Sequence, residues 1–177
     1  MTQQSQPDRP RHRVLADVAR QLDRRRDGEL PWSRQTAAVF ADHEDLLVAL
    51  HARWHRILAV RIDPLLERGC SPAELVAVWR ALAAETTGQR QVLDRASEAD
   101  LPRLRAVSQR QDAALAVVAG LVSHRVDPRI AARAWRVAVT ASTVQEQRRS
   151  MRSMLTVPTL RQRLLSRCPC RTRQVAA

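Results

Sequence analysis

The strongest structural signal in the chain is SPAELVAVWRALA, residues 71–83. A serine accepts hydrogen bonds from the free backbone N–H groups at the start of a helix, and proline is favoured at the first helical position. Glu74, three residues after Ser71, completes a capping box. Apolar residues from Leu75 to Leu82 then recur at helical spacing, so the segment predicts an amphipathic helix.

Similar patterns on both sides of this segment predict an all-α protein. The sequence has only four glycines, and no segment alternates β-branched and polar residues between glycine-rich turns. Apolar periodicity and caps predict a single bundle of about five to seven helices. Further helices are expected after residue 12, Ser33, Asp42 or Asp45, Asp100 and Asp127, with a last short amphipathic helix at residues 160–165.

Four finer expectations concern the core and the helix ends. Pro64 is expected to interrupt the long third helix, because the residue before a proline avoids the α conformation. The longest apolar run, residues 113–122, is about half of the ~20 residues that span a bilayer, so a buried helix is expected and a transmembrane segment is not. Trp32 is expected to pack on Ala37, and Ile130 is expected to point inward.

The positive charge is concentrated at the end of the chain. The net charge is +12, and all thirty basic residues are arginine. Residues 147–177 contain eight arginines and no acidic residue, whereas residues 35–100 contain more acids than arginines. The expected organisation is a flexible arm at residues 1–11, a helical bundle at residues 12–146 and an arginine-rich tail at residues 147–177.

The tail is the leading candidate for a binding site. Uncompensated positive charge at this density favours an anionic partner. Nucleic acid is one such partner, and an anionic membrane surface is the other, since methionines and leucines alternate with the arginines. A solvated tail without a partner is the remaining alternative. The candidate polyanion-binding residues are Arg148, Arg149, Arg152, Arg161, Arg163, Arg167, Arg171 and Arg173.

A metal site is a lower-ranked alternative. Glu44, His51 and His55 fall on one side of the third helix, because residues four and seven apart lie close around a helix axis. Imidazole and carboxylate groups bind divalent metals in helical bundles. Three ligands from one helix make an incomplete shell, however, so histidines at the edge of the core are the favoured interpretation and no cofactor is expected.

Residues 61–84 have the outline of a helix-turn-helix. An apolar residue, a glycine and a capped second helix follow one another as in that motif. Base reading requires arginine, glutamine or asparagine at the start of the second helix. Ala73, Glu74 and Ala77 stand there instead, and Arg80 comes only a turn later, so a connection between two packed helices is favoured over a DNA-binding regulator.

No pattern in the chain predicts an enzyme. Phosphate-binding glycine loops and nucleophile elbows are absent from the sequence. The three cysteines, Cys70, Cys168 and Cys170, do not form a disulfide framework, and the first residues lack the apolar core of a signal peptide. We therefore expect a cytoplasmic protein, either free or bound at the inner face of the membrane.

Two segments resemble proteins of a known kind. Residues 44–54, EDLLVALHARW, and residues 77–85, AVWRALAAE, resemble small helical accessory proteins of conjugative plasmids from GC-rich mycelial bacteria, the spread or Kil-type proteins. The resemblance covers about residues 35–95 and implies a non-enzymatic role in plasmid transfer. It assigns no functional residue. The expected function is therefore an accessory protein whose bundle contacts a protein partner or a second copy and whose tail contacts DNA or a membrane.

Overall fold

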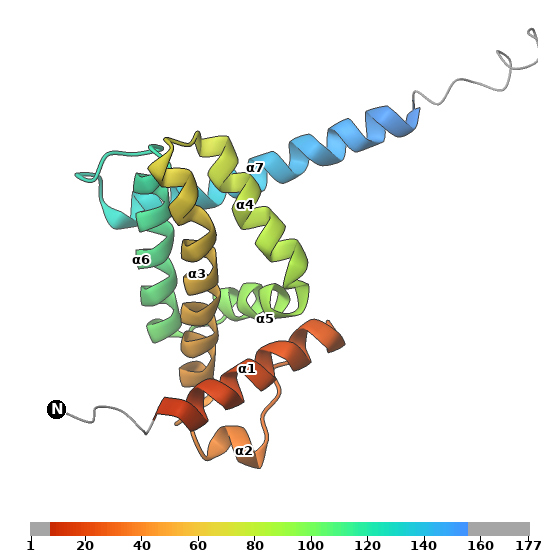
Figure 1. Cartoon of the computed structure of the whole chain (residues 1–177), viewed down its shortest axis with the longest axis vertical. Helices are drawn as coiled ribbons and strands as arrows, with labels where there is room; N and C mark the ends of the chain where they lie inside the picture. Colours follow the sequence, from red (N-terminus) through yellow and green to blue (C-terminus); the bar gives the residue numbers. More distant parts are fainter. Residues whose placement is uncertain (1–7, 156–177) are drawn as a thin grey trace, which may run out of the picture. The chain divides into compact units, whose positions relative to one another are not determined.

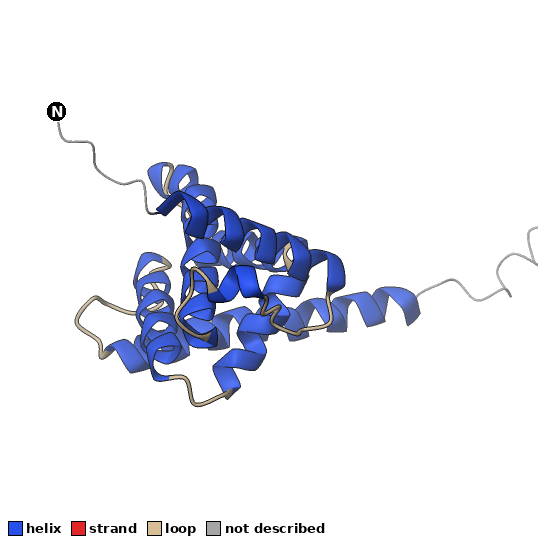
Figure 2. Ribbon diagram, turned by 90° about the horizontal axis from the view of Figure 1, so that it is seen from below, coloured by secondary structure: helices blue, strands red, loops and turns tan. Residues whose placement is uncertain are grey.

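The computed structural model describes residues 8–155, with side chains from residue 10 to residue 141. All regular structure in this part of the chain is α-helical, which confirms the all-α prediction (Figures 1 and 2). These residues form seven helices, at the upper end of the expected number. The helices are α1 (Asp8–Arg25), α2 (Arg34–Ala37), α3 (His43–Glu67), α4 (Pro72–Glu85), α5 (Thr87–Glu98), α6 (Pro102–Val118) and α7 (Pro128–Leu155).

The chain divides into two units between Val139 and Thr140. The first unit contains α1 to α6 and the opening turns of α7. The second unit contains the rest of α7, so the first nine residues of the expected tail, 147–155, are helical. The remainder of the tail, including the short helix expected at residues 160–165, lies outside the described residues.

Helix α1 begins at Asp8, before the expected start at residue 12. Residues 8–11 are therefore helical and do not belong to a flexible arm. Arg11 explains the difference, because its guanidinium donates to the Asp45 carboxylate at 2.7 Å and to the Val39 carbonyl at 3.0 Å. It also lies over the Phe40 ring, 4.4 Å from the centroid. These contacts fix the first turn of α1 through residues distant in sequence.

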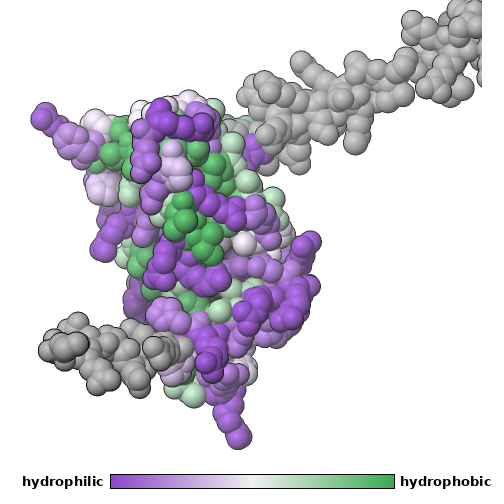
Figure 3. Space-filling model, in the orientation of Figure 1, coloured by the Kyte–Doolittle hydropathy of each residue, from purple (hydrophilic) through white to green (hydrophobic). Residues whose placement is uncertain are grey.

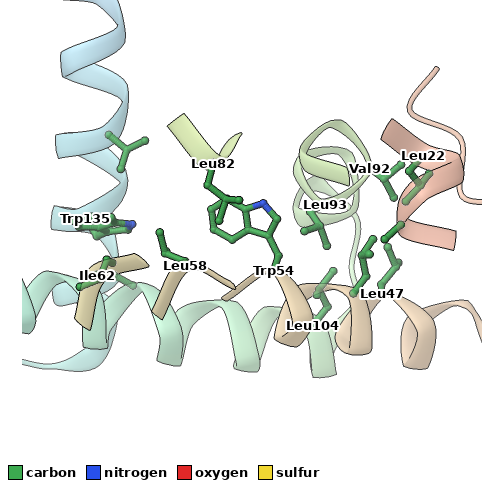
Figure 4. Packing of buried hydrophobic residues seen from close by; sticks show 14 of the residues in the cluster. Leu22, Leu47, Trp54, Leu58, Ile62, Leu82, Val92, Leu93, Leu104 and Trp135 are labelled. Atoms are coloured by element: carbon green, nitrogen blue, oxygen red, sulfur yellow. The ribbon is translucent and has the colours of Figure 1, made fainter. Parts of the chain in front are cut away.

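Helix α3 is the centre of the first unit and contacts α1, α4, α5 and α6. Its Trp54 is fully buried and lies near Leu82 and Leu93, while Trp135 of α7 lies beside Ile62 (Figure 4). The Trp54 indole N–H donates to the Thr86 hydroxyl at 2.9 Å, so its one polar group is satisfied in the core. Burial of aromatic and leucine side chains is the main source of stability in such a bundle.

Both serine caps predicted from the sequence are confirmed. Ser71 and Glu74 form the reciprocal capping box at the start of α4. Ser33 caps α2, and the residue that completes its box is Thr36, whose hydroxyl accepts the Ser33 backbone N–H at 2.6 Å. Cap motifs are encoded within four residues, so they are recognised without knowledge of the tertiary structure.

The predicted packing of Trp32 on Ala37 is wrong. Trp32 stacks on the ring of His43, with centroids 4.2 Å apart and planes 23° apart, and Ala37 is exposed. Helix α2 is a single turn, so it offers Trp32 less surface than the ring at the start of α3.

Helix α5 lacks a cap of its own and receives one from α1. The residue at its N-cap position, Thr86, makes no side-chain cap bond. The Asp23 carboxylate instead accepts the Gln89 backbone N–H at 3.1 Å and also the Gln89 side-chain amide. The two helices approach closely at Gly88, where an added Cβ would lie 1.9 Å from the Leu22 carbonyl oxygen. Gly88 is therefore a packing residue at the α1–α5 contact.

Helix α6 is capped in the same way by α3. Leu101 at its N-cap position makes no side-chain cap bond, and the Glu44 carboxylate accepts the backbone N–H groups of Arg103 at 2.7 Å and Leu104 at 3.1 Å. Because the starts of α3 and α6 meet at this point and His51 meets Ser108 further along, the two helices run parallel.

Pro64 does not interrupt α3, which continues to Glu67, so this prediction is wrong. The proline leaves the Val60 carbonyl without its helical partner. Val60 is 68 % exposed, and water can hydrate a carbonyl on that side of the helix. Hydration of this carbonyl offsets part of the cost of the missing bond, and α3 ends only before Gly69, whose φ is +72°.

The expectation of a buried helix over residues 113–122 is only partly correct. Helix α6 ends at Val118, and Gly120 takes a φ of +66° beyond it. Val118 and Leu121 are 46 % and 36 % exposed, and Ile130, expected to point inward, is 60 % exposed. On the face drawn in Figure 3, hydrophobic residues form separate patches among hydrophilic ones. None of the described helices combines the length and hydropathy that a bilayer span requires.

Candidate anion-binding cleft

The tail arginines predicted to bind polyanions cannot be placed in a site. Arg148, Arg149 and Arg152 belong to α7, but their side chains lie outside the described part. The other five, Arg161, Arg163, Arg167, Arg171 and Arg173, lie outside the described residues altogether. Polyanion binding by the tail therefore stays a prediction from charge.

Of the three candidate metal ligands, only His51 and His55 lie next to each other, and Glu44 has other partners. Besides capping α6, the Glu44 carboxylate accepts the Arg103 guanidinium at 2.9 Å, and Arg103 also pairs with Asp42. Burial alone would raise the pKa of Glu44, but the hydrogen bonds from Arg103 and from the α6 backbone hold it below its usual range. The described side chains include no group of three or more residues that fits a metal ion.

His51 and His55 are core residues, 4 % and 7 % exposed, with ring centroids 4.3 Å apart. Burial lowers the pKa of His51 to about 4, and the Arg90 charge acts in the same direction. Burial, His51 and Arg90 together lower the pKa of His55 to about 3. Both rings are therefore neutral at pH 7, and they lie within the core, deeper than the core-edge position expected from the sequence.

The corner at residues 61–84 joins α3 to α4 without presenting groups that read bases. Ala73 and Ala77 are exposed on the first turns of α4. The Glu74 carboxylate is bound to the Ser71 backbone N–H at 2.8 Å and to the Arg68 guanidinium at 3.2 Å. No donor projects from these first turns toward a DNA groove.

A cleft of about 350 Å³ opens between the end of α5, the first turns of α6 and the first turns of α7. Small alanine side chains and Leu104 form its apolar part. Four arginines line it, Arg105 from α6 and Arg129, Arg133 and Arg136 from α7, and no carboxylate belongs to the lining. We call this site the arginine cleft.

Helix geometry places three of these arginines together. Arg129, Arg133 and Arg136 are four and three residues apart, so they lie on one face of α7. The buried residues of the same turns, Trp135 and Ala131, hold the opposite face in the core. The α7 arginines are consequently fixed on the cleft side by the packing of the helix.

Two of the four arginines have acidic partners beside the cleft. Arg105 pairs with Asp100 at 2.8 Å, and this pair is exposed, so it contributes little and can be exchanged for another anion. Arg136 pairs with Asp112 at 2.7 Å. Burial raises the pKa of Asp112 although Arg136 opposes the shift. The guanidinium groups of Arg129 and Arg133 have no carboxylate partner among the described residues, although the Arg129 backbone N–H donates to the Asp127 carboxylate at 2.7 Å.

Ser108 connects the cleft to the buried histidines. Its side chain is half-buried and lines the cleft, and its hydroxyl oxygen lies 3.1 Å from His51 Nε2. The cleft therefore combines guanidinium groups with a hydroxyl whose neighbour is a neutral imidazole. Such donors bind phosphate or carboxylate oxygens.

The sequence carried one signal for this cleft, the spacing of Arg129, Arg133 and Arg136. This spacing did not stand out, because arginine is abundant throughout the chain. Ser108 and Arg105 had no signal of their own, because only the packing of α6 against α3 and α7 brings them to the same place.

Comparison with known proteins adds no assignment to this geometry. No family model matches the chain. No curated protein and no solved structure matches it either.

Proposed function

We propose that this protein is a non-enzymatic accessory protein that binds DNA through phosphate contacts. The arginine cleft of the bundle and the arginines of the tail both contribute to this binding. The observation that supports the proposal is the composition of the cleft, which four guanidinium groups line and no carboxylate lines. Phosphate contacts supply most of the affinity of proteins that bind DNA without reading its sequence.

The shape of the cleft favours DNA over a membrane surface. Binding along a membrane surface typically uses an amphipathic helix whose apolar face enters the bilayer. A concave cleft instead suits a phosphate that protrudes from a polymer backbone. Arg129 and Arg133 are exposed at this cleft, and their guanidinium groups form no ion pair with a carboxylate of the described residues.

Fluorescence anisotropy with a labelled DNA duplex tests this proposal on the full-length protein. The cleft variant carries Arg129→Gln and Arg133→Gln. A matched control carries Arg34→Gln and Arg56→Gln, which remove the same charge from exposed positions outside the cleft lining. A tail variant carries glutamine at all eight tail arginines.

The proposal expects the cleft variant to bind the duplex about tenfold or more weakly than the control variant, since each lost phosphate contact is an electrostatic loss. The tail variant is expected to lose affinity as well. Equal affinities of the cleft and control variants would remove the cleft from the proposal. Flotation of the protein with anionic vesicles, together with no binding to the duplex, would replace DNA by a membrane surface.

The biological setting we propose is plasmid transfer, on the resemblance of residues 44–54 and 77–85. In this setting the bundle contacts a protein partner or a second copy while the arginines contact DNA. Deletion of the gene from a transmissible plasmid is expected to lower transfer frequency and to leave plasmid copy number unchanged. Unchanged transfer frequency would contradict this setting.

A further inference from the structure

The hydrogen bond between Ser108 and His51 determines what the cleft offers to a ligand. Ser108 Oγ and His51 Nε2 are 3.1 Å apart, and either atom is a possible donor. The other ring nitrogen of His51, Nδ1, is buried and has no hydrogen-bond partner among the residues that the structure describes. The position of the single proton on the neutral ring therefore decides the direction of the bond.

The favoured tautomer has its proton on Nε2. A proton on Nδ1 would be a buried N–H without an acceptor, and such orphaned donors are rare in folded proteins. With the proton on Nε2, His51 donates to Ser108 and only a lone pair is left unmatched at Nδ1. Ser108 then keeps its own hydroxyl proton for an acceptor in the cleft.

The charge of the cleft matches a dianion. Arg105 and Arg136 each have an acidic partner, so the guanidinium groups without an ion pair among the described residues are those of Arg129 and Arg133. A phosphomonoester carries about −1.5 to −2 at pH 7 and has three terminal oxygens. A phosphodiester within a strand carries one negative charge and has two such oxygens, so it leaves part of the positive charge unmatched.

We propose that the arginine cleft binds a phosphomonoester, with Arg129 and Arg133 neutralising its charge and the Ser108 hydroxyl donating to one of its oxygens. This inference rests on the proposed function, because it takes the cleft to be the phosphate site. It adds that the preferred ligand is a terminal phosphate, carried by a DNA strand or by a free nucleotide. The volume of about 350 Å³ is at the lower end of the range for small-ligand pockets.

The test compares two single-stranded oligonucleotides that differ only in a 5′-phosphate or a 5′-hydroxyl group. Both are titrated against the full-length protein by anisotropy, and a nucleoside monophosphate and inorganic phosphate are titrated by calorimetry. The 5′-phosphorylated strand is expected to bind about tenfold more tightly, because its terminal phosphate accepts hydrogen bonds from charged donors that the 5′-hydroxyl strand lacks. The Arg129→Gln and Arg133→Gln variant is expected to lose this preference, and the Arg34→Gln and Arg56→Gln control to keep it.

Two serines of the cleft provide a matched pair of variants. The Ser97 hydroxyl already donates to the Asp94 carbonyl at 2.7 Å, so Ser97→Ala is expected to leave the preference unchanged. Ser108→Ala is expected to reduce this preference about threefold, since the two arginines still contribute, and Ser108→Thr, which keeps a hydroxyl, is expected to restore it. Thermal unfolding of each variant verifies that the bundle is intact.

The outcomes separate this inference from the proposed function. Equal binding of the two strands would overturn the inference and leave DNA binding in place. Tight binding of the nucleoside monophosphate without binding of either strand would support the phosphomonoester and overturn DNA. If Ser97→Ala and Ser108→Ala had the same preference for the 5′-phosphorylated strand, Ser108 would not contact the phosphate.

Discussion

Asp23 of α1 accepts the backbone N–H of Gln89 in α5 at 3.1 Å and caps a helix that begins more than sixty residues later in the chain. The bond links the end of one helix to the start of another. Because Thr86 makes no cap bond, Asp23 is the side chain that satisfies this end of α5 among the described residues. The same arrangement recurs where Glu44 caps α6.

Asp23→Ala is expected to lower the free energy of unfolding by about 1–2 kcal/mol, the usual effect of losing a helix cap. Asp23→Asn keeps a side-chain oxygen and is expected to cost less than half as much. Urea unfolding measures both changes. Asp63→Ala is the control, since Asp63 is exposed on α3 and its removal is expected to change stability by less than about 0.5 kcal/mol. An equal effect of the Asp23→Ala and Asp63→Ala substitutions would contradict the role of this cap.

Gly88→Ala is expected to be among the most damaging substitutions in the bundle. The added methyl group would meet the Leu22 carbonyl oxygen at 1.9 Å, and backbone atoms of a packed helix cannot yield as a flexible side chain does. We expect a loss of about 3 kcal/mol or more in urea unfolding.

Gly69→Ala is the comparison for this prediction. Gly69 has a φ of +72° but no atom within 4 Å of an added Cβ, so its cost is conformational alone, about 1–2 kcal/mol. A larger loss for Gly69→Ala than for Gly88→Ala would show that the α1–α5 contact is looser than the structure indicates.

The features that the sequence predicted correctly are local. Ser71 and Glu74 are three residues apart, and the proline after Asp127 marks the start of α7 in the same short-range way. The features that it missed depend on tertiary contacts. Pro64 is tolerated because Val60 faces solvent, and Gly88 is needed because α5 approaches the Leu22 backbone of α1 at this residue. Neither environment is encoded near the residue concerned.

The candidate sites also have one part that the sequence predicts and another that depends on tertiary packing. The charge of the tail follows from counting residues, whereas the arginine cleft requires α5, α6 and α7 to be placed together. Glu44, His51 and His55 share a helix face as the spacing indicated. Their roles differ because their neighbours differ: Glu44 meets the exposed start of α6, and the histidines meet the core. The spacing of residues shows on which side of a helix their side chains lie, whereas tertiary packing determines which groups those side chains contact.

The buried histidines make the stability of the bundle depend on pH. In the unfolded chain a histidine has a pKa near 6.5, whereas burial lowers the pKa of His51 to about 4 and that of His55 to about 3. Below pH 6.5 the unfolded state binds protons that the folded state does not, so stability is full above this pH and falls as pH decreases. The loss is up to about 1.4 kcal/mol per pH unit for each histidine and levels off below the folded pKa values.

Urea unfolding between about pH 7.5 and pH 5 measures this dependence, above the range in which most carboxylates titrate. A His51→Gln and His55→Gln variant is expected to be less stable at pH 7.5 but to have a flatter pH profile. His124→Gln removes an exposed histidine and is expected to keep the original slope. An unchanged slope in the double variant would show that the two rings are protonated as easily in the folded chain as in the unfolded one.

The salt dependence of DNA binding reports how many phosphates the arginine cleft neutralises. The logarithm of the binding constant for duplex DNA falls with the logarithm of salt concentration, with a slope of about −0.9 for each phosphate contact. Arg129→Gln together with Arg133→Gln is therefore expected to make the slope less steep by about one, because the two side chains contact the same phosphate. The Arg34→Gln and Arg56→Gln variant, of equal net charge, is expected to change it by much less because those side chains lie outside the cleft lining. Anisotropy titrations at several salt concentrations give both slopes, and identical slopes would mean that the two α7 arginines do not contact phosphate.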